Sequence, residues 1–497
     1  MKKQAPYRQD MVIHYQASHV LTDRLLHSWV RCNRKAWLDR YGNPASRVWS
    51  AHRALQLDHQ QKSFNELIPN KPGQGIRACQ AGLEAVVGVR LKGFGPSNEL
   101  LEAHPPFLQR VAGTSRWGEF MYRPVIARQG RKLTRDHKLA LSLIGLLLEQ
   151  VQKSPVPNGL VISKTHTGLE RQTISLDKVS LQKQLKDSLI KLNADLIRSE
   201  PPALTSDRRK CSLCSWRGLC NIEAKATGNL NEVSGIGSKR KQMLHEVGIS
   251  TVHDLATADP IALSNSLQTF GEQHGQVAPQ LVSQAKVQDI GIPKRLNLAP
   301  AIPELKKAPG VLLYDIESDP DIHDDFLHGF IRLNRKSNGE WDLNGAKYQP
   351  ILALHEHGSA LCWKRLKRKL TIYKDWPVLH YGETEAISLI RLATKQGANE
   401  KELAELRNQL IDIHSRLRLH WLLPLNNYGL KVVANWTGFH WKHKGVDGAR
   451  ALLWWRQWRS AKQEARRKSN QLKWLLQYNQ DDCFATWAVA KWLFNQD

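Results

Sequence analysis

One ten-residue stretch, Val311–Pro320, constrains this chain most, because it runs an apolar segment directly into carboxylates. It reads VLLYDIESDP, and its first four residues are typical of a short buried strand. Asp315, Glu317 and Asp319 follow them. Apolar packing tolerates carboxylates there only when a cation or hydrogen-bond donors compensate them. Asp315 and Glu317 are two residues apart, so on a strand they face the same side and provide half of a Mg²⁺ or Mn²⁺ site.

The charge of the chain predicts a polyanionic partner. Its 497 residues include 72 Lys and Arg but only 46 Asp and Glu, which gives a net charge of +26. This excess favours nucleic acid as the partner, and we expect DNA rather than RNA. A surface that merely carries an excess of solvated lysine is the plainer alternative. The length predicts two to four domains.

Neither a leader nor a membrane span is expected. Residues 1–20 lack the apolar core of a signal peptide, and the longest nearly apolar run, Leu139–Leu148, is too short to cross a bilayer. We therefore expect a cytoplasmic protein with no membrane partner. Disulfides are rare in that compartment, so grouped cysteines indicate a metal site.

Four of the cysteines follow such a pattern. Cys211, Cys214 and Cys220 form a C-x₂-C-x₅-C array, and Cys32 lies in Ser18–Tyr41, whose apolar spacing predicts one N-capped helix. Three thiolates on a short loop hold one face of an iron–sulfur cluster, and a fourth ligand comes from elsewhere. Four thiolates also suit Zn²⁺, so both metals remain open.

The helix around Cys32, of the form LxxWxRCxRKxWL, and the distant cysteine array together resemble the RecB-like PD-(D/E)xK nucleases with an iron–sulfur staple. That group includes the CRISPR-associated exonucleases and the AddB-type helicase–nuclease subunits. The resemblance implies that residues 1–225 form such a domain and that a helicase or repair protein is a partner. It also implies a [4Fe–4S] cluster held by Cys32, Cys211, Cys214 and Cys220.

The cleavage motif of that family is missing from the matching stretch. Ile126 stands at the acidic position of the (D/E)-x-K strand, and Arg128 replaces the lysine. A metal needs the carboxylate, and isoleucine offers no donor atom, so we predict that this domain is degenerate and inactive. A different alignment would make Glu119 or Asp136 an active-site acid.

The middle of the chain, residues 226–295, contains a glycine pair followed by basic residues. The pattern VxGIGxKxxxxLxxxGIxTxxDLA resembles a helix–hairpin–helix. Two glycines let backbone N–H groups approach a phosphate beside a helix N-terminus. We expect Gly235, Gly237, Lys239 and Arg240 to bind the nucleic-acid backbone without reading bases. Alternatively, the glycines only make a tight turn in a helical spacer.

The last part of the chain, residues 300–497, follows a proline-rich basic linker at 291–309. Residues 325–333 are typical of a strand that forms a hairpin with the strand before them. Residues 377–382 predict another strand, which ends in a glycine before a helix start. Residues 472–493 predict a long closing helix.

These elements resemble the DEDD exonucleases of the RNase H-like superfamily. The resemblance implies a site made of Asp315, Glu317, Glu385, Tyr478 and Asp482. Many relatives have Asp where Glu385 stands, and Glu383 is the second candidate there. Tyr478 and Asp482 share one helical face, whereas Asp481 points about 100° away. Asp412 begins a helix, and we expect it to cap that helix.

The chemistry explains this choice of residue types. Phosphodiester hydrolysis uses two divalent ions about 3.5–4 Å apart, which the four carboxylates would hold as Mg²⁺ or Mn²⁺. Tyr478 would orient the attacking water, because a tyrosine that titrates near ~10 is a poor base. The resemblance thus implies a metal-dependent nuclease of 3′→5′ polarity. The alternative is a nucleic-acid-binding scaffold of a repair or helicase complex without catalysis.

A basic stretch at 446–470 interleaves arginines with Trp454, Trp455 and Trp458. We expect Arg456 and Arg459 to follow phosphates while tryptophans stack on bases. The alternative places every tryptophan in the core. The expected fold class is α/β, with a degenerate restriction-endonuclease-like domain, a helix–hairpin–helix region and an RNase H-like mixed sheet with flanking helices.

Overall fold

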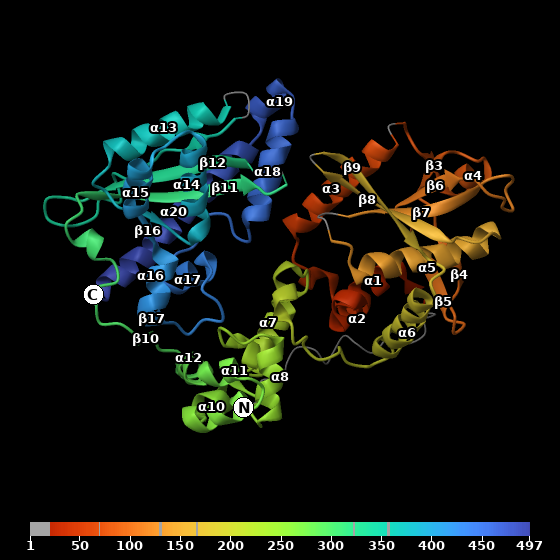
Figure 1. The fold of residues 1–497 in the computed structure, drawn as a ribbon, viewed down its shortest axis with the longest axis horizontal. Helices are drawn as coiled ribbons and strands as arrows, with labels where there is room; N and C mark the ends of the chain where they lie inside the picture. The colour runs from red at the N-terminus through yellow and green to blue at the C-terminus, as the bar shows by residue number, and fades with distance from the viewer. Residues whose placement is uncertain (1–19, 69, 129–131, 166, 322–323, 355–357) are drawn as a thin grey trace. The chain divides into compact units, whose positions relative to one another are not determined.

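The computed structural model describes residues 20–68, 70–128, 132–165, 167–321, 324–354 and 358–497 (Figure 1). The chain forms two compact units. The first comprises the residues up to Val48 together with Arg53–Thr205 and Cys214–Gly218. The second comprises Trp49–His52, Ser206–Leu213 and Leu219–Asp497. Residues 226–295, which the sequence sets apart as a region of their own, therefore belong to the same compact unit as residues 300–497.

The first unit is built on a six-stranded mixed sheet with the order β2-β3-β6-β7-β8-β9. Its strands are β2 (Gly73–Gln74), β3 (Ala85–Val87), β6 (Phe107–Val111), β7 (Met121–Ala127), β8 (Asn158–Thr165) and β9 (Gly168–Ser175). A smaller sheet of order β1-β5-β4 contains β1 (Leu21–Thr22), β5 (Leu100–Ala103) and β4 (Leu91–Phe94). Strand β7 is antiparallel to β6 and parallel to β8.

Helices pack against the sheets of the first unit, and α5, whose buried leucines include Leu139, Leu143 and Leu147, contacts α1 and α6. The helices are α1 (Asp23–Arg31), α2 (Asn33–Tyr41), α3 (Ala51–Leu67), α4 (Gly75–Gln80), α5 (Arg135–Gln152) and α6 (Val179–Leu196). Helix α5 connects β7 to β8, as a parallel strand pair requires a crossover.

The prediction of one continuous helix through Cys32 is wrong. Cys32 is extended, with φ −166° and ψ 120°, and it separates α1 from α2. Thr22 caps α1 by accepting a hydrogen bond from the Leu25 N–H at 3.1 Å. The predicted start at Ser18 lies outside the described residues. Cys32 therefore lies at a break between two helices, where its extended backbone ends one helix and begins the next.

Short helices make up the middle of the chain. They are α7 (Arg217–Ala226), α8 (Ser238–Glu246), α9 (Val252–Thr257), α10 (Pro260–Gln268), α11 (Glu272–Gln276) and α12 (Ala278–Ile290). Gly235 precedes α8 with φ +92°, a conformation that favours glycine. The predicted linker contains a short strand, β10 (Lys294–Arg295), antiparallel to β17 (Trp421–Leu422). Gln284 of α12 donates a hydrogen bond to the Leu423 carbonyl at 2.8 Å.

A second six-stranded sheet forms the centre of the C-terminal part, with the order β13-β12-β11-β15-β16 and β14 paired to β12. Its strands are β11 (Gly310–Asp319), β12 (Asp324–Asn334), β13 (Lys347–Tyr348), β14 (Ile351–Leu352), β15 (Val378–His380) and β16 (Leu410–Asp412). Strands β11 and β12 form the predicted hairpin, and β15 is parallel to both β11 and β16. The prediction for the strand at 377–382 and the helix after it is confirmed.

Helices cover both faces of this sheet (Figure 1). They are α13 (Gly358–Ile372), α14 (Glu383–Lys395), α15 (Glu400–Gln409), α16 (Ile413–His420), α17 (Leu430–Trp436), α18 (Gly448–Ser460), α19 (Gln463–Lys468) and α20 (Gln471–Asn495). Leu312 and Tyr314 of β11 belong to the core with α13–α15, whereas Val311 and Leu313 belong to the core with α16, α17 and α20. Side chains alternate along a strand, so Asp315 and Glu317 continue the row that faces α20.

Candidate metal centre

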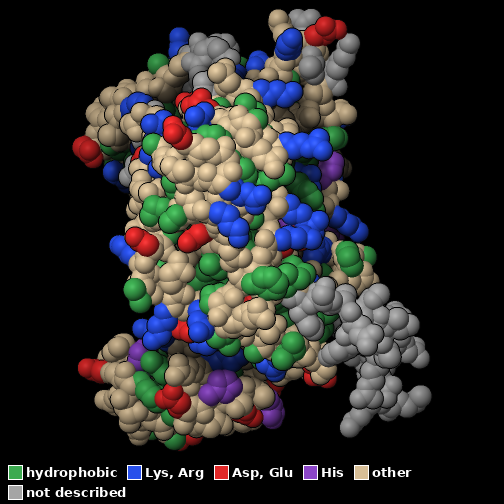
Figure 2. All heavy atoms as spheres, turned by 90° about the vertical axis from the view of Figure 1, so that its right-hand side faces the viewer, with side chains coloured by type: hydrophobic (Ala, Val, Ile, Leu, Met, Phe, Trp, Pro, Cys, Tyr) green, Lys and Arg blue, Asp and Glu red, His purple; other side chains and the backbone are tan. Residues whose placement is uncertain are grey.

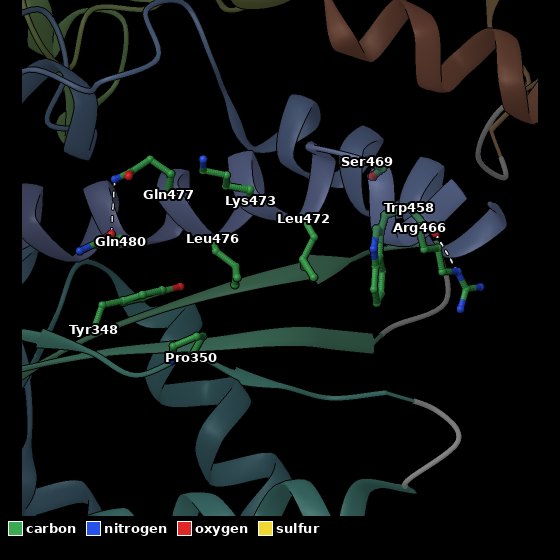
Figure 3. Close-up of a pocket in the computed structure, with 10 residues that line it drawn as sticks. All are labelled: Tyr348, Pro350, Trp458, Arg466, Ser469, Leu472, Lys473, Leu476, Gln477 and Gln480. Carbon is green, nitrogen blue, oxygen red and sulfur yellow. Dashed lines mark hydrogen bonds between the residues drawn. The ribbon is translucent and has the colours of Figure 1, made fainter. Parts of the chain in front are cut away.

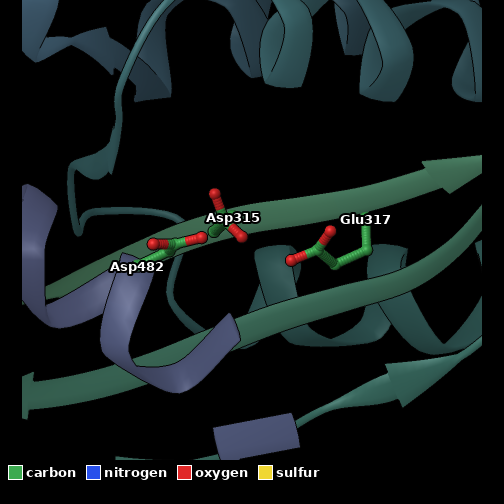
Figure 4. Close-up of side chains that lie close together, drawn as sticks. All are labelled: Asp315, Glu317 and Asp482. Atoms are coloured by element: carbon green, nitrogen blue, oxygen red, sulfur yellow. The ribbon is translucent and has the colours of Figure 1, made fainter. Parts of the chain in front are cut away.

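Three carboxylates meet where α20 crosses β11 (Figure 4). Asp315 and Glu317 come from the strand, and Asp482 comes from the helix. One ligand oxygen from each lies within 4.8 Å of the others. Glu317 and Asp482 are buried, and Asp315 is partly buried. The structure thus brings together three side chains of the two distant motifs.

The strand is longer than the apolar run predicts, because β11 continues through Asp319. Its register with β12 shifts between Glu317 and Ser318. Past this irregularity, Asp319 accepts two hydrogen bonds from the Arg456 guanidinium, at 2.6 and 2.8 Å. The Arg456 guanidinium therefore balances the charge of Asp319, and Asp319 does not belong to the carboxylate group.

Asp315 is held in place by an amide. The Asn479 side-chain N–H donates to Asp315 Oδ2 at 2.6 Å, and the Tyr348 hydroxyl donates to Asn479 Oδ1 at 2.7 Å. Asn479 lies so close to β12 that a Cβ on Gly329 would be 1.6 Å from its Oδ1. A glycine at position 329 thus allows Asn479 to reach the strand and fix the orientation of Asp315.

Asp482 has partners of its own. The Trp441 indole N–H donates to Asp482 Oδ1 at 2.6 Å, and Tyr478 hydrogen-bonds to the same carboxylate. Lys431 of α17 lies beside them, with its Nζ 4.7 Å from the centroid of the Tyr478 ring. Burial raises the pKa of Tyr478 well above its usual value, and the charge of Asp482 adds to this. Tyr478 is thus suited to orient a group rather than to remove a proton.

The pKa values of the three carboxylates are all raised by burial. Burial raises the pKa of Asp315 well above its usual value, and the charges of Asp482 and Glu317 raise it further. Burial likewise raises the pKa of Glu317 well above its usual value. Burial raises the pKa of Asp482 to about 6, although Lys431 and the Trp441 hydrogen bond oppose the rise. A cation would remove this penalty.

Glu385 is near the carboxylates without belonging to the group that lies within 4.8 Å. It is in the first turn of α14, which begins after Gly382 with φ +106°. Burial raises the pKa of Glu385 to about 7, and Asp412 and Asp482 add to this. Its Oε2 is buried and has no hydrogen-bond partner among the described residues. Glu383, the second candidate for this position, is exposed.

Two neighbouring acids have structural roles. Asp412 caps α16, as expected, by accepting a hydrogen bond from the His414 N–H at 2.9 Å, and it also accepts one from the Gly382 N–H at 2.8 Å. Asp481 accepts hydrogen bonds from the Lys442 N–H and the Gln477 amide, both at 2.9 Å. It thus binds the loop before α18 and not the carboxylate group.

This donor set fits a divalent cation. Buried carboxylate oxygens without a basic group in direct contact are costly unless a cation compensates them, and Mg²⁺ and Mn²⁺ prefer oxygen ligands. The unpartnered Glu385 oxygen provides a further ligand close by. Asp315, Glu317 and Asp482 are thus the residues that would hold a metal, with Glu385 as a fourth.

The predicted phosphate contacts at the glycine pair differ in their surroundings. Gly237 precedes α8 with open space where a Cβ would be, and Lys239 is exposed. The Arg240 guanidinium donates to the Gly235 carbonyl at 2.6 Å and so braces the turn. Gly237 and Lys239 therefore remain available to a ligand, whereas Arg240 also has a structural contact.

The basic helix α18 is partly core. Trp454 and Trp455 are buried, and Trp458 is half-buried. Arg456 binds Asp319 and, at 2.7 Å, also Asp321, while Arg459 lies 5.6 Å from the Trp455 ring centroid. The phosphate contacts predicted for these two arginines stay predictions, and Arg456 has carboxylate partners that would compete for its donors.

The four predicted cluster ligands form no disulfide bond within the described part of the chain. Cys32 and Cys214 belong to the first unit, and Cys211 and Cys220 to the second. Burial raises the pKa of Cys214, and the nearby Cys32 contributes to this. Ligation of a cluster by the four thiols stays a prediction.

In the described part of the first unit, the residues at the predicted cleavage motif form no acidic site. Ile126 is buried in β7, and Arg128 forms an ion pair with Glu170 at 3.3 Å. Glu119 is exposed, and Asp136 lies 3.4 Å from the His27 imidazole. Among the described residues, the carboxylate group on β11 and α20 is the one in which three such ligands converge.

A separate cavity of about 630 Å³ lies along α20, between Leu472 and Gln480 on one side and Tyr348 and Trp458 on the other (Figure 3). Its helix residues include Leu476, which is about 200° around the helix from Tyr478. The cavity therefore opens on another face of α20 than the one that carries Tyr478.

Sequence reasoning did not find four residues that shape the carboxylate group, namely Tyr348, Lys431, Trp441 and Asn479. Asn479 directly follows Tyr478 in the sequence, and this position is the one signal that could have pointed to it. Lys431 and Trp441 lie in a segment without a recognisable pattern, and only packing brings them to Asp482.

A comparison with known families agrees with this fold and site. Residues 312–494 match the family model of the RNase_H superfamily. The C-terminal part of the chain is an RNase H-like domain, and this match includes the three clustered carboxylates, Glu385 and Tyr478. No curated protein matches the chain by sequence.

The described helices also differ from those that cross a membrane. Within the described residues, no helix combines the length and the apolar character that crossing a bilayer requires.

Proposed function

We propose that this protein is a metal-dependent nuclease that hydrolyses phosphodiester bonds of nucleic acid in its RNase H-like domain. The observation that carries the proposal is the group formed by Asp315, Glu317 and Asp482, whose ligand oxygens lie within 4.8 Å of one another. An RNase H-like domain with such a group is suited to nucleic-acid hydrolysis through divalent ions.

Each side chain has a definite role in this reaction. Asp315, Glu317 and Asp482 would hold Mg²⁺ or Mn²⁺, with Glu385 as a fourth ligand. Divalent ions bound there would supply a nucleophile and stabilise developing negative charge. Tyr478 would donate a hydrogen bond that orients the attacking water, because its raised pKa keeps the hydroxyl protonated. The resemblance to the DEDD exonucleases implies 3′→5′ exonuclease action.

Nucleic acid as the substrate is supported by charge. The net charge of +26 is reflected in the many Lys and Arg side chains on the face that Figure 2 shows, where acidic side chains are fewer. Counterion release from phosphates gives such surfaces their affinity. DNA is the substrate we favour over RNA.

The rest of the chain would serve binding. Residues 1–225 would form a RecB-like domain without its own cleavage chemistry, stapled by a [4Fe–4S] cluster on Cys32, Cys211, Cys214 and Cys220. Residues 226–295 would grip the backbone as helix–hairpin–helix elements. The protein would act in the cytoplasm with a helicase or repair partner. Iron and sulfide analysis of anaerobically purified protein separates the cluster from Zn²⁺.

The test uses end-labelled single-stranded DNA, double-stranded DNA and RNA with Mn²⁺ or Mg²⁺. Wild-type protein should shorten at least one substrate from its 3′ end, and Asp315→Asn should not. Asp375→Asn, which changes an exposed acid on the same domain, is the matched control. Circular single strands distinguish exonuclease from endonuclease action. Full activity in Asp315→Asn, or no degradation of any substrate, would contradict the proposal.

A scaffold that binds nucleic acid without cleaving it is the second candidate. The observation that favours it is Glu385, which stays outside the group of close carboxylates. Calorimetric titration with Mn²⁺ discriminates between the two, since a nuclease site should bind the ion and lose this binding in Asp315→Asn. A scaffold would bind DNA equally well with and without the ion.

A further inference from the structure

Helix α17 brings a lysine to the carboxylate group. Lys431 is the second residue of α17, and its Nζ lies 4.7 Å from the Tyr478 ring centroid and 5.7 Å from that of Trp441. Tyr478 and Trp441 both hydrogen-bond to the Asp482 carboxylate. The ammonium group is therefore fixed against the residues that orient one of the metal ligands.

One hydrogen bond holds the Lys431 ammonium among the described residues. Within the part of the chain that the structure describes, its ammonium donates to the Val446 carbonyl. An ammonium has three donors, so two N–H groups remain for another acceptor. The aromatic faces of Tyr478 and Trp441 favour a cation without using a donor. This geometry holds the charge in place and leaves it able to bind an anion.

The charge is coupled to the carboxylates. Lys431 lowers the pKa of Asp482 and of Glu317, against the effect of their burial. Burial lowers the pKa of Lys431 itself, and Asp482 opposes this most strongly among the charges. With Asp315, Glu317, Asp482 and Glu385 ionised, Lys431 and two divalent ions would leave one positive charge, which is the charge that a single phosphodiester neutralises.

We propose that Lys431 is a substrate-positioning residue that donates a hydrogen bond to a nonbridging oxygen of the phosphodiester at the carboxylate group. This inference rests on the proposed nuclease function. The ammonium contributes to substrate affinity through the charge of that phosphate. It also repels divalent ions, so its removal should tighten metal binding.

The experiment compares wild type with Lys431→Met, Lys431→Arg and the control Lys444→Met, which changes an exposed lysine in the loop between α17 and α18. Binding of a labelled oligonucleotide is measured in Ca²⁺, together with Mn²⁺ affinity by calorimetry, kcat and KM in Mn²⁺, and thermal unfolding. A second oligonucleotide carries a neutral methylphosphonate at the terminal linkage, which removes the phosphate charge that Lys431 would contact.

Lys431→Met should bind the normal oligonucleotide about tenfold or more weakly, as expected for a lost charge-assisted hydrogen bond. The methylphosphonate should weaken wild type clearly more than it weakens Lys431→Met, because the two changes share the loss of one interaction. Lys431→Arg should restore most of the affinity. Lys431→Met should also bind Mn²⁺ more tightly, and Lys444→Met should match wild type in every measurement.

Independent penalties from the lysine and the methylphosphonate substitutions would overturn the inference, as would wild-type affinity in Lys431→Met. Lys431→Gln provides the same comparison if the methionine variant does not fold. Failure of the proposed function is a different result, namely a wild-type protein that cleaves no substrate. A wild type that cleaves while Lys431→Met keeps its KM would contradict only the role of Lys431.

Discussion

Two central strands, β7 in the first unit and β11 in the second, have neighbours of the same kind and carry opposite chemistry. Each pairs antiparallel on one side and parallel on the other. On β7 the buried side chain of Ile126 is apolar, whereas β11 places Asp315 and Glu317 toward α20. A mixed sheet thus accommodates apolar or acidic side chains. The buried carboxylates have a desolvation cost that a cation would offset.

The pKa values of Asp136 in the first unit and Asp315 in the second also shift in opposite directions. Burial opposes ionisation of Asp136, yet its hydrogen bond with Thr134 and the charges of His137 and His27 hold its pKa below the usual value. Burial raises the pKa of Asp315, and the like charges of Asp482 and Glu317 raise it further. Local hydrogen bonds and opposite charges stabilise the ionised form of an acid such as Asp136. In a group of acids that raise one another's pKa, a bound metal would stabilise the ionised forms.

The largest expected effect separates the two strands directly. Asp315→Asn should lower nuclease activity by about 10³-fold or more, because bound divalent ions supply several kcal/mol of transition-state stabilisation. Glu119→Ala and Asp136→Ala should keep activity within about twofold. Rates on the preferred labelled substrate provide the measurement. Loss of activity in either first-unit variant, with activity kept in Asp315→Asn, would place the active centre in the first unit.

Metal binding should stabilise the second unit selectively. Mn²⁺ at about one hundred times its dissociation constant should add about 2.7 kcal/mol to the free energy of unfolding. Calorimetric scans with and without Mn²⁺ measure the shift, and Asp482→Asn should lose most of it. Substitution of Ile126 by Val on β7 is the control, which should leave the metal-dependent shift intact. An equal shift in Asp482→Asn would show that the ion binds elsewhere.

The pH dependence should be visible in the metal-free protein as a difference between variants. The pKa of Glu385 is raised to about 7, so the folded state binds more protons than the unfolded state between about pH 4.5 and 7. Wild type should therefore lose stability relative to Glu385→Gln as the pH rises through that window, by up to roughly 3 kcal/mol. Urea unfolding at several pH values measures this difference.

The comparison with Glu385→Gln is needed because buried histidines act in the opposite direction. Burial lowers the pKa values of His27 and His328 to about 4, so their contributions rise with pH up to about 6.5. Both are present in the two proteins and cancel in the difference. A difference that grows in favour of wild type between pH 5 and 7 would contradict the raised pKa of Glu385.

The smallest of these effects concerns the support of Asp315. Gly329→Ala places a Cβ in the position of Asn479 Oδ1, and the displaced amide should cost about 1–3 kcal/mol of stability. Mn²⁺ affinity should fall with it, because Asn479 orients Asp315. Gly159→Ala on β8 of the first unit is the matched control, where the Cβ meets Leu141. It should lower stability and leave Mn²⁺ affinity unchanged.

Much of the C-terminal sheet could be predicted, because its signals are local. The apolar run before Asp315, the hairpin after it and the closing helix follow from periods of two and 3.6 residues. The apolar run nevertheless predicted too short a strand, since β11 continues through its carboxylates to Asp319. The helix around Cys32 was predicted as one element, yet a single extended residue divides it.

The candidate site likewise has one part that the sequence predicts and another that it does not. By itself, the sequence determined that Asp315 and Glu317 share a face and that Tyr478 and Asp482 share another, because both relations follow from backbone geometry. Only the tertiary structure decided that these faces meet, that Asp319 binds Arg456 instead, and that Lys431 reaches Tyr478. Those contacts join segments far apart in the chain, so packing decides them and no local period encodes them.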